Sequence, residues 1–255
     1  MATFVLAPGF WLGGWAWREV TDSLRAAGHT VYPVTLTGLG ERVHLSSPQV
    51  DLDTHISDVV NLIRYEDLRD VILVGHSYAG AVVTGAADQI PERVARLVYV
   101  DTVPLPDGIA QIQFNSQAGR EAQVNMVATQ GDGWRLPMPS WEDLDQGNDL
   151  VGLGAEERLL MRERAVDQPF GTITQPLRLR NPARQEIPRI GIWCSQTIRE
   201  VQEMAASYPA LCSALAEPGW EFVELPTGHW PMFSKPRALA QVLEGLVNRA
   251  QIELG

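Results

Sequence analysis

The sequence predicts an α/β fold in which a mostly parallel six-stranded sheet carries helices on both faces. Short apolar runs rich in β-branched residues recur along the chain, and segments with helical periodicity lie between them. Val71–Val74 and Leu97–Val100 are apolar without alternation, as is typical of parallel strands covered on both faces. The 255 residues, 45% of them hydrophobic, suffice for one large domain of this kind or two small ones.

Six strands are expected. One of them, Thr30–Leu36, contains Pro33, which weakens the prediction because proline cannot donate a hydrogen bond to a neighbouring strand. The other five strands are expected at Phe4–Ala7, Val71–Gly75, Leu97–Val100, Ile190–Cys194 and Glu221–Leu225.

Four helices are expected around the sheet. Their apolar faces consist of Trp17, Val20 and Leu24; of Ile56, Val59, Val60 and Ile63; of the small residues in Ala79–Ala87; and of Leu239, Val242, Leu243 and Leu246. Asp53 or Thr54 is available to cap the second helix, and Gly28 to end the first.

Residues 105–186 interrupt this alternation. The segment is rich in Gly, Pro, Gln and acidic residues, and it contains one clear helical run, Ala155–Val166. A structureless loop of this length is uncommon inside a compact domain. We therefore expect a single domain over residues 1–255, with a helical cap inserted at about 105–186.

Composition excludes several classes of function. Twenty Lys and Arg residues against 31 Asp and Glu give a formal net charge of −11, which disfavours nucleic acid and anionic membrane surfaces as partners. No run approaches the ~18–20 apolar residues of a membrane helix, and the N-terminal segment lacks the basic region of a signal peptide. Only Cys194 and Cys212 are present, which favours reduced thiols in the cytoplasm.

The segment Val71–Gly80 indicates a nucleophile. A strand, a tight turn and a helix follow one another, with Ser77 at the turn, as a nucleophile elbow requires. The usual pattern is G-x-S-x-G; here Ala79 replaces the last glycine and Gly80 follows it. The alternative is an ordinary Gly-Ser turn between a strand and a helix.

A serine nucleophile needs a base, and His229 is the candidate. It comes directly after the last expected strand, so it can meet Ser77 at the edge where parallel strands end. The alternative is a loop histidine bonded to backbone. The remaining histidines lie in a turn, a loop, a helix start and the elbow itself: His29, His44, His55 and His76.

Asp101 is the candidate for the third group, a carboxylate that orients the imidazole. It ends the strand Leu97–Val100, at the same edge as Ser77. The penultimate strand, where this acid is most common, is followed by no acid before Glu200, which we expect inside a helix. Asp101 could instead cap the turn that follows it.

Acyl transfer also requires hydrogen-bond donors for a developing oxyanion. The backbone N–H of Tyr78, directly after the serine, is one candidate. The loop after the first strand supplies the other: Gly9 permits close approach, and the N–H of Phe10 is the best placed.

Five segments together resemble the α/β-hydrolase superfamily, and within it the small bacterial serine esterases related to plant methylesterases and hydroxynitrile lyases. They are FVLAPGFWLGGWAW, TLTGLGER, GHSYAG, LVYVDTVP and LPTGHWPM, beginning at residues 4, 35, 75, 97 and 225. The resemblance implies Ser77 as nucleophile, His229 as base, an acid at Asp101, and neither a metal nor an organic cofactor.

Three departures narrow the expected chemistry. Family members usually carry His-Gly after the first strand, where this chain has Pro8-Gly9, so the oxyanion loop is expected to be held differently. The related hydroxynitrile lyases have a lysine after the histidine, where this chain has Trp230. A serine nucleophile also disfavours the dehalogenase and epoxide hydrolase chemistries of the same fold.

The expected function is hydrolysis of a carboxylic ester of a neutral, apolar or aromatic small molecule. Trp11 and Trp230 are candidates for substrate contact, with core packing as the alternative. Acidic residues in and near the cap would disfavour an anionic substrate: Glu142, Asp143, Asp145, Asp149, Glu156 and Glu157. A lactone-directed or non-hydrolytic enzyme and a non-catalytic ligand receptor are the alternatives, and a homodimer is left open.

Overall fold

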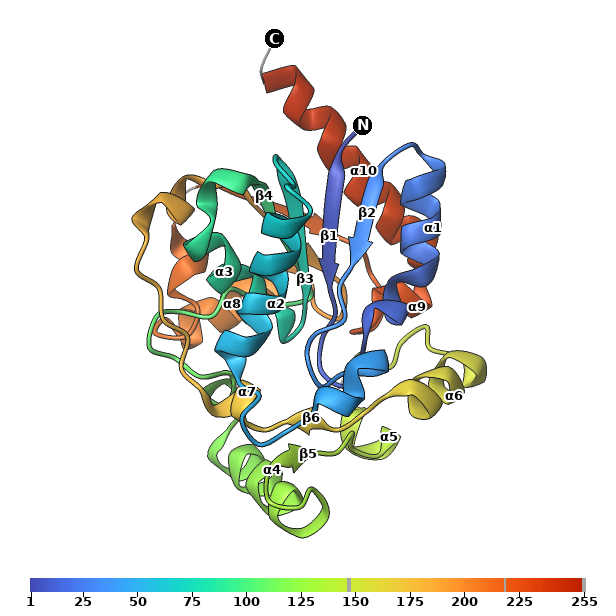
Figure 1. The fold of residues 1–255 in the computed structure, drawn as a ribbon, viewed down its shortest axis with the longest axis vertical. Helices are drawn as coiled ribbons and strands as arrows, with labels where there is room; N and C mark the ends of the chain where they lie inside the picture. The colour runs from blue at the N-terminus through green and yellow to red at the C-terminus, as the bar shows by residue number, and fades with distance from the viewer. Residues whose placement is uncertain (146–147, 218, 254–255) are drawn as a thin grey trace.

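The main sheet contains six strands in the order β2-β1-β3-β4-β7-β8 (Figure 1). The computed structural model describes residues 1–145, 148–217 and 219–253. All five neighbouring pairs in this sheet are parallel, which confirms the predicted sheet. The strands are β1 (Thr3–Ala7), β2 (Thr30–Pro33), β3 (Val71–His76), β4 (Val94–Val100), β7 (Arg189–Trp193) and β8 (Trp220–Glu224).

Helices cover both faces of the sheet. Phe4 and Leu6 of β1 pack in one apolar cluster with α1 (Arg18–Ala26) and α10 (Pro236–Glu253). The intervening Val5 and Ala7 pack in a second cluster with α2 (Leu52–Tyr65) and α3 (Ala79–Gln89). Figure 1 shows the two pairs of helices on opposite sides of the strands. The inner strands β1, β3, β4 and β7 are largely apolar because both of their faces are buried.

Smaller elements connect these layers. Helix α8 (Ile198–Ser207) contacts β8, and α9 (Pro231–Ser234) leads into α10. The short 3₁₀ turns are η1 (Gly14–Trp17), η2 (Gly40–Leu45), η3 (Pro91–Arg93), η4 (Gln111–Phe114), η5 (Pro182–Glu186) and η6 (Ser213–Ala216).

Two local expectations need correction. Strand β2 ends at Pro33 rather than continuing to Leu36, although the Val34 N–H still donates to the Leu6 carbonyl of β1 at 2.9 Å. Because β2 is an edge strand, the nitrogen of Pro33 faces away from β1 and no hydrogen bond of the pair is lost. Helix α2 is capped by Asp51, two residues before Asp53 and three before Thr54: the Asp51 carboxylate accepts the Thr54 backbone N–H at 2.9 Å. Thr54 instead completes the capping box from inside the helix.

We refer to residues 105–186 as the cap segment. It runs beneath the carboxyl ends of β1 and β2 (Figure 1) and includes the expected helix, α6 (Ala155–Arg164). A second long helix, α4, was not predicted, because Val127 is its one buried residue and no apolar stripe marks it. The other elements are α4 (Gln117–Gln130), β5 (Arg135–Leu136), α5 (Trp141–Leu144), β6 (Gln168–Pro169) and α7 (Gly171–Thr174).

The register of the central strands places their carboxyl ends side by side. His76 of β3 pairs with Val100 of β4, and Val100 pairs with Ile192 of β7. The pairing continues one residue further, because the Ser77 N–H donates to the Val100 carbonyl and the Asp101 N–H to the Ile192 carbonyl. Ser77 and Asp101 therefore stand on neighbouring strand ends.

Both cysteines are buried free thiols. Among the helices that the structure describes, none combines the length and the apolarity needed to cross a membrane.

Candidate active site

Ser77 lies at the turn between β3 and α3 with a φ of +52°, in the left-handed region that non-glycine residues rarely adopt. The turn is tight because Gly75 has no side chain: a Cβ there would lie 2.6 Å from the Ala79 carbonyl oxygen and 2.8 Å from Val83 Cγ2. Ala79, which replaces the usual glycine, fits with its side chain fully buried. The local geometry is that of the expected elbow.

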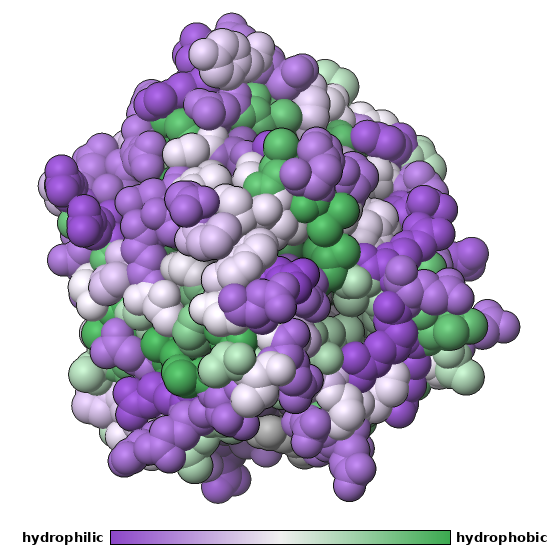
Figure 2. All heavy atoms as spheres, turned by 60° about the horizontal axis from the view of Figure 1, so that its bottom comes forward, coloured by the Kyte–Doolittle hydropathy of each residue, from purple (hydrophilic) through white to green (hydrophobic). Residues whose placement is uncertain are grey.

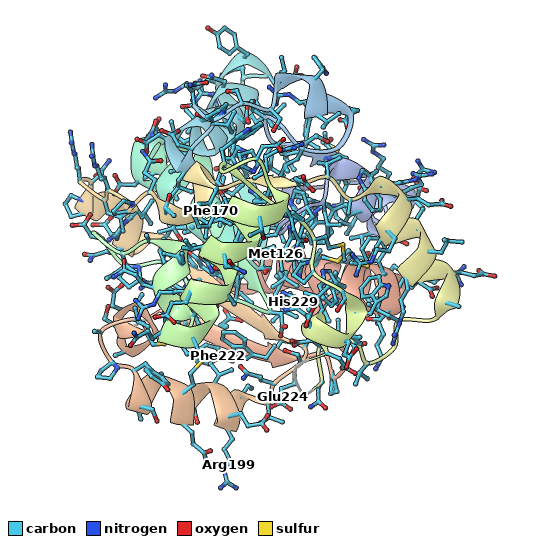
Figure 3. The ribbon with its side chains drawn as sticks, turned by 90° about the horizontal axis from the view of Figure 1, so that it is seen from below. Met126, Phe170, Arg199, Phe222, Glu224 and His229 are labelled. Carbon is cyan, nitrogen blue, oxygen red and sulfur yellow. The ribbon has the colours of Figure 1, made fainter. Side chains whose placement is uncertain are left out.

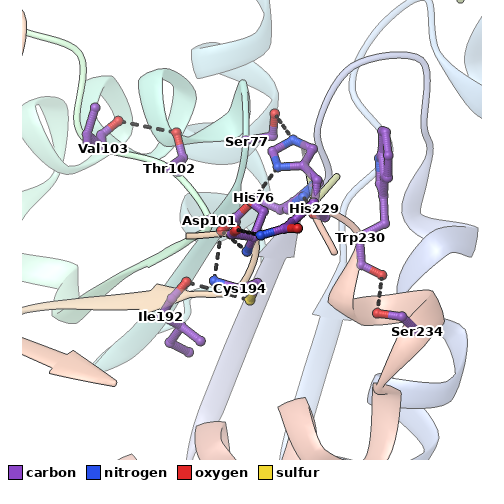
Figure 4. Close-up of polar contacts among 12 residues, drawn as sticks. His76, Ser77, Asp101, Thr102, Val103, Ile192, Cys194, His229, Trp230 and Ser234 are labelled. Atoms are coloured by element: carbon purple, nitrogen blue, oxygen red, sulfur yellow. Dashed lines mark hydrogen bonds and ion pairs between the residues drawn. The ribbon is translucent and has the colours of Figure 1, made fainter. Parts of the chain in front are cut away.

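Ser77, His229 and Asp101 form a continuous line of hydrogen bonds (Figure 4). His229, in the loop after β8, has its Nε2 2.9 Å from Ser77 Oγ and its Nδ1 2.6 Å from Asp101 Oδ2. A carboxylate only accepts, so Nδ1 carries the proton and Nε2 is free to accept one from the serine hydroxyl. Three strands far apart in sequence thus bring together a hydroxyl, an imidazole and a carboxylate.

Asp101 is fixed on all sides. Its φ is +50°, and its Oδ1 accepts the backbone N–H groups of Cys194 and Ser195 at 2.8 and 3.0 Å. Its Oδ2 accepts the Ser195 hydroxyl at 2.7 Å as well as the His229 ring. Burial alone would raise the pKa of Asp101, but the hydrogen bonds and charge of His229 and the donors of Ser195 lower it to about 2.

Glu200 has a different place. It is the third residue of α8, where its exposed carboxylate accepts the backbone N–H and the hydroxyl of Thr197 at 2.7 and 2.8 Å. These bonds form a capping box, and they lower the pKa of the Glu200 carboxyl. The carboxylate beside His229 is that of Asp101.

His229 is held by its backbone as well as by its ring. Its N–H donates to the Asp149 carbonyl at 2.8 Å, and its carbonyl accepts from His76 Nε2 at 2.6 Å. Burial disfavours the imidazolium, but the hydrogen bond and charge of Asp101, with a contribution from Asp149, raise the pKa of His229 above 6.5. Burial, together with nearby His229, lowers the pKa of His76 to about 3, so His76 is neutral at pH 7.

The two residues expected to supply oxyanion donors lie against each other. The rings of Phe10 and Tyr78 stack with centroids 4.7 Å apart and planes inclined by 19°. The loop after β1 comes so close to the elbow that a Cβ on Gly9 would lie 3.0 Å from Ser77 Cβ and 2.9 Å from His76 Nδ1. Glycine is required there for this close approach.

Behind the stack, Tyr78 is held by a histidine that the sequence did not single out as functional. His55 is fully buried; its Nδ1 lies 2.9 Å from the Tyr78 hydroxyl, and its Nε2 donates to the Thr37 carbonyl at 2.8 Å. Burial lowers the pKa of His55 to about 4, so the ring is neutral and its Nδ1 accepts a hydrogen bond from the Tyr78 hydroxyl. Asp58 holds Thr37 in turn and pairs with Arg42 at 3.0 Å, which gives the TLTGLGER segment a structural role.

Trp11 and Trp230 are both nearly buried. Trp230 is 4% exposed, with its ring edge-on to His229 at 5.1 Å between centroids. Trp11 is 8% exposed, and it packs with Leu136 and Ile173 of the cap segment. Met126 and Phe170, labelled in Figure 3, border the same cluster. Packing therefore accounts for most of both indole surfaces.

A cavity of about 410 Å³ opens beside His229 and Asp101. Among the described residues that line it, Asp101 is the one carboxylate, and those besides His229 carry no charge: Thr102, Val103, Gln111, Phe114, Asn115, Trp193, Ser195, Gln196 and Met204. The molecular face on the cap side mixes hydrophilic and hydrophobic patches (Figure 2). A small neutral molecule with both apolar and hydrogen-bonding groups suits such a wall.

Comparison with known proteins decides the family. A family model described as the alpha/beta hydrolase family matches residues 4–242. The chain belongs to the α/β-hydrolase family. The fold expected from the five sequence segments is thereby confirmed.

Individual relatives refine this assignment. The hydrolase is 34% identical over 258 residues to the carbendazim hydrolyzing esterase of Nocardioides sp. (strain SG-4G), covering 96% of this chain and 100% of that one. It is 25% identical to methylesterase 3 of Arabidopsis thaliana, covering 96% and 95% of the two chains. The resemblance to the plant methylesterases is confirmed.

A solved structure shows the same fold. An extracellular α/β-hydrolase from a Paenibacillus species superposes with a TM-score of 0.80 at 22% identity, covering 95% of this chain and 98% of that one.

Proposed function

We propose that this α/β-hydrolase is a serine esterase that cleaves a carboxylic ester of a neutral, apolar or aromatic small molecule through an acyl-enzyme intermediate. The observation that carries the proposal is the hydrogen-bonded line from Ser77 Oγ through the His229 ring to Asp101. Two related proteins are named for ester chemistry, a carbendazim hydrolyzing esterase and a methylesterase.

Acylation begins at Ser77. Its Oγ attacks the ester carbonyl carbon while His229 Nε2 takes the hydroxyl proton, and the carbonyl oxygen becomes an oxyanion. Asp101 stabilises the imidazolium and keeps its Nδ1–H directed at the carboxylate. The imidazolium then gives its proton to the departing alkoxide, which leaves as the alcohol, and the acyl group remains on Ser77.

Deacylation repeats the sequence with water. His229 takes a proton from a water molecule whose oxygen attacks the acyl carbon, and then returns it to Ser77 Oγ as the carboxylic acid leaves. In both steps we assign the oxyanion to the backbone N–H groups of Phe10 and Tyr78, where loss of one donor typically costs about 10²–10³ in rate.

The surroundings of the line favour a neutral substrate. Burial raises the pKa of Asp149, His229 opposes this shift, and the negative charges of Asp101 and Asp145 add to it, so three carboxylates lie near one another beside His229. An anionic ester would be repelled there. We assign the leaving alcohol to the neutral cavity beside His229, and the cap segment to the role of a cap over the strand ends. Trp11 and Trp230 are 8% and 4% exposed, so a substrate can contact only a small part of either indole ring.

A fluorophosphonate probe combined with an ester screen tests the proposal. We expect the probe to label Ser77, and the enzyme to hydrolyse at least one neutral ester among aryl esters, methyl esters, thioesters and lactones. The Ser77→Ala variant should lose both properties. A folded protein that binds apolar ligands but is neither labelled nor active would instead be a receptor, and strong preference for lactones would redefine the substrate.

A further inference from the structure

The loop after β1 is tied to the cap segment at Trp11. The Trp11 backbone N–H donates to Gln168 Oε1 at 3.1 Å, and the Trp11 carbonyl accepts the Val166 N–H at 3.1 Å. The indole Nε1–H donates to the Leu136 carbonyl, also at 3.1 Å. Trp11 has a φ of +65°, a conformation that costs a non-glycine residue free energy and needs such contacts to persist.

The side-chain amide of Gln168 is oriented so that its oxygen accepts the Trp11 backbone N–H. Its side chain is fully buried in β6, and its Nε2 donates to Thr172 Oγ1 at 2.8 Å. The Thr172 hydroxyl donates in turn to the Pro169 carbonyl at 2.6 Å, so it can only accept from the amide. This orients the amide with its oxygen toward Trp11, since a reversed amide would place two donors face to face.

The Trp11 N–H belongs to the same rigid peptide plane as the Phe10 carbonyl. Gln168 therefore fixes one side of Phe10, while Gly9, packed on Ser77, fixes the other. The stack on Tyr78 holds the Phe10 ring. Pro8, at the start of this loop, has no backbone N–H to donate.

We propose that Gln168 is a positioning residue that directs the Phe10 N–H into the oxyanion hole by clamping the Trp11 peptide from the cap segment. This rests on the function proposed above. Gln168 touches neither the substrate nor Ser77 in this scheme, and it acts through the Trp11 peptide.

Gln168→Met tests the clamp, because methionine keeps the length of the side chain and removes both the acceptor and the donor. The control is Gln175→Met. Gln175 is a second glutamine of the cap segment that accepts a backbone N–H from outside it, that of Asp53 at 2.9 Å in α2, remote in sequence from the oxyanion loop. Circular dichroism selects a temperature at which all variants are folded.

We expect Gln168→Met to lower kcat by about 10- to 100-fold, less than outright loss of a donor, while KM changes little. A trifluoromethyl ketone supplies a second readout, because Ser77 Oγ adds to its carbonyl carbon, His229 takes the proton, and a stable oxyanion forms. Its affinity should fall by a similar factor in Gln168→Met and remain near wild type in Gln175→Met.

Gln168→Glu keeps the test decisive if the methionine variant does not fold. A protonated carboxyl can replace the amide, with its carbonyl oxygen accepting from Trp11 and its hydroxyl donating to Thr172, whereas a carboxylate places a negative charge behind the oxyanion. The kcat of Gln168→Glu relative to wild type should therefore fall as pH rises.

The outcomes separate the two proposals. Unchanged kcat and ketone affinity in Gln168→Met, or a pH-independent ratio for Gln168→Glu, overturn the clamp while leaving the esterase intact. A wild-type protein that neither hydrolyses esters nor reacts with the fluorophosphonate overturns the proposed function and the clamp with it.

Discussion

Three of the six described non-glycine residues with a left-handed φ belong to the proposed site or to its oxyanion loop. Trp11, Ser77 and Asp101 each follow a strand end and each adopt a left-handed φ, between +50° and +65°. Such conformations cost of order 1–3 kcal/mol each, and they persist where neighbouring contacts over-determine them. The donors around Asp101 and the bonds around Trp11 are contacts of this kind.

Asp101→Asn should reduce kcat by about 10³–10⁴-fold, because an amide beside Nδ1 no longer enforces the tautomer that leaves Nε2 free. Glu200→Gln is the matched control: it also converts a carboxylate to an amide, but on an exposed helix cap. It should leave kcat within about twofold of wild type. Steady-state kinetics on one neutral ester measure both. The reverse pattern would move the acid role to Glu200.

The pH dependence follows from the direction of the His229 shift. Only the neutral imidazole can accept the serine proton, and Asp101 raises the pKa of His229 above 6.5. We expect kcat/KM to be low in acid and to rise through that pKa as pH increases. Asp101 itself, with its pKa lowered to about 2, stays ionised across this range.

The same electrostatics predict the response to Asp101→Asn. Without the negative charge the imidazolium is less stable, so the pKa of His229 should move down. NMR titration of the His229 ring in both proteins measures the shift. An unchanged or higher pKa in the variant would mean that Asp101 does not stabilise the imidazolium.

The proposed catalytic residues could be predicted from the sequence because each follows a segment that is recognisable as a strand. Ser77 and Asp101 directly follow apolar runs that are recognisable as strands, and the register aligns them. His229 lies in the loop after the last strand, β8. Gln168 and His55 carry no such mark. Their partners Trp11 and Tyr78 lie 157 and 23 residues away in the chain, so only the folded structure reveals the contacts.

At the scale of elements, the junction of β3 and α3 fixes the elbow. Gly75 lets the helix start against the strand, and a Cβ at this position would meet the Ala79 carbonyl. The inner strands β1, β3, β4 and β7 were predictable because burial on both faces makes them largely apolar. Helix α4 was not, since its sequence carries almost none of the core.

Gly75→Ala should lower the free energy of unfolding by about 1–3 kcal/mol, because the added methyl forces the junction apart. Gly245→Ala in α10 is the control, as a Cβ there meets no atom within 4 Å. That variant should be neutral or stabilised by up to about 1 kcal/mol, since alanine is the better helix former. Urea unfolding compares them. Equal stability of the two variants would contradict the packing at the elbow.

At the scale of the whole molecule, the cap segment covers the edge of the sheet where the proposed site lies, and the negative net charge of the protein affects which substrates approach that edge. The cap segment contacts the oxyanion loop at Trp11. Asp149, also in the cap segment, accepts the His229 backbone N–H with its carbonyl. The net charge of −11 extends this negative field over the protein. Selection among substrates should therefore depend on their charge.

We expect kcat/KM for a neutral ester to change little with ionic strength. A matched ester carrying a carboxylate should be poorer at low salt and should improve as added salt screens the repulsion. Paired rate measurements across a salt series test this. Preference for the anionic ester, weakening with salt, would reveal a cationic site and contradict the neutral-substrate proposal.

Trapping the acyl-enzyme tests the central claim most directly. A slowly deacylating p-nitrophenyl ester should give a burst of about one equivalent of p-nitrophenol, since acylation precedes hydrolysis. Peptide mapping should place the acyl group on Ser77 in the wild type, and the Ser77→Ala protein should show neither burst nor adduct. Turnover at the wild-type rate in Ser77→Ala, or an acyl group on another residue, would contradict the account.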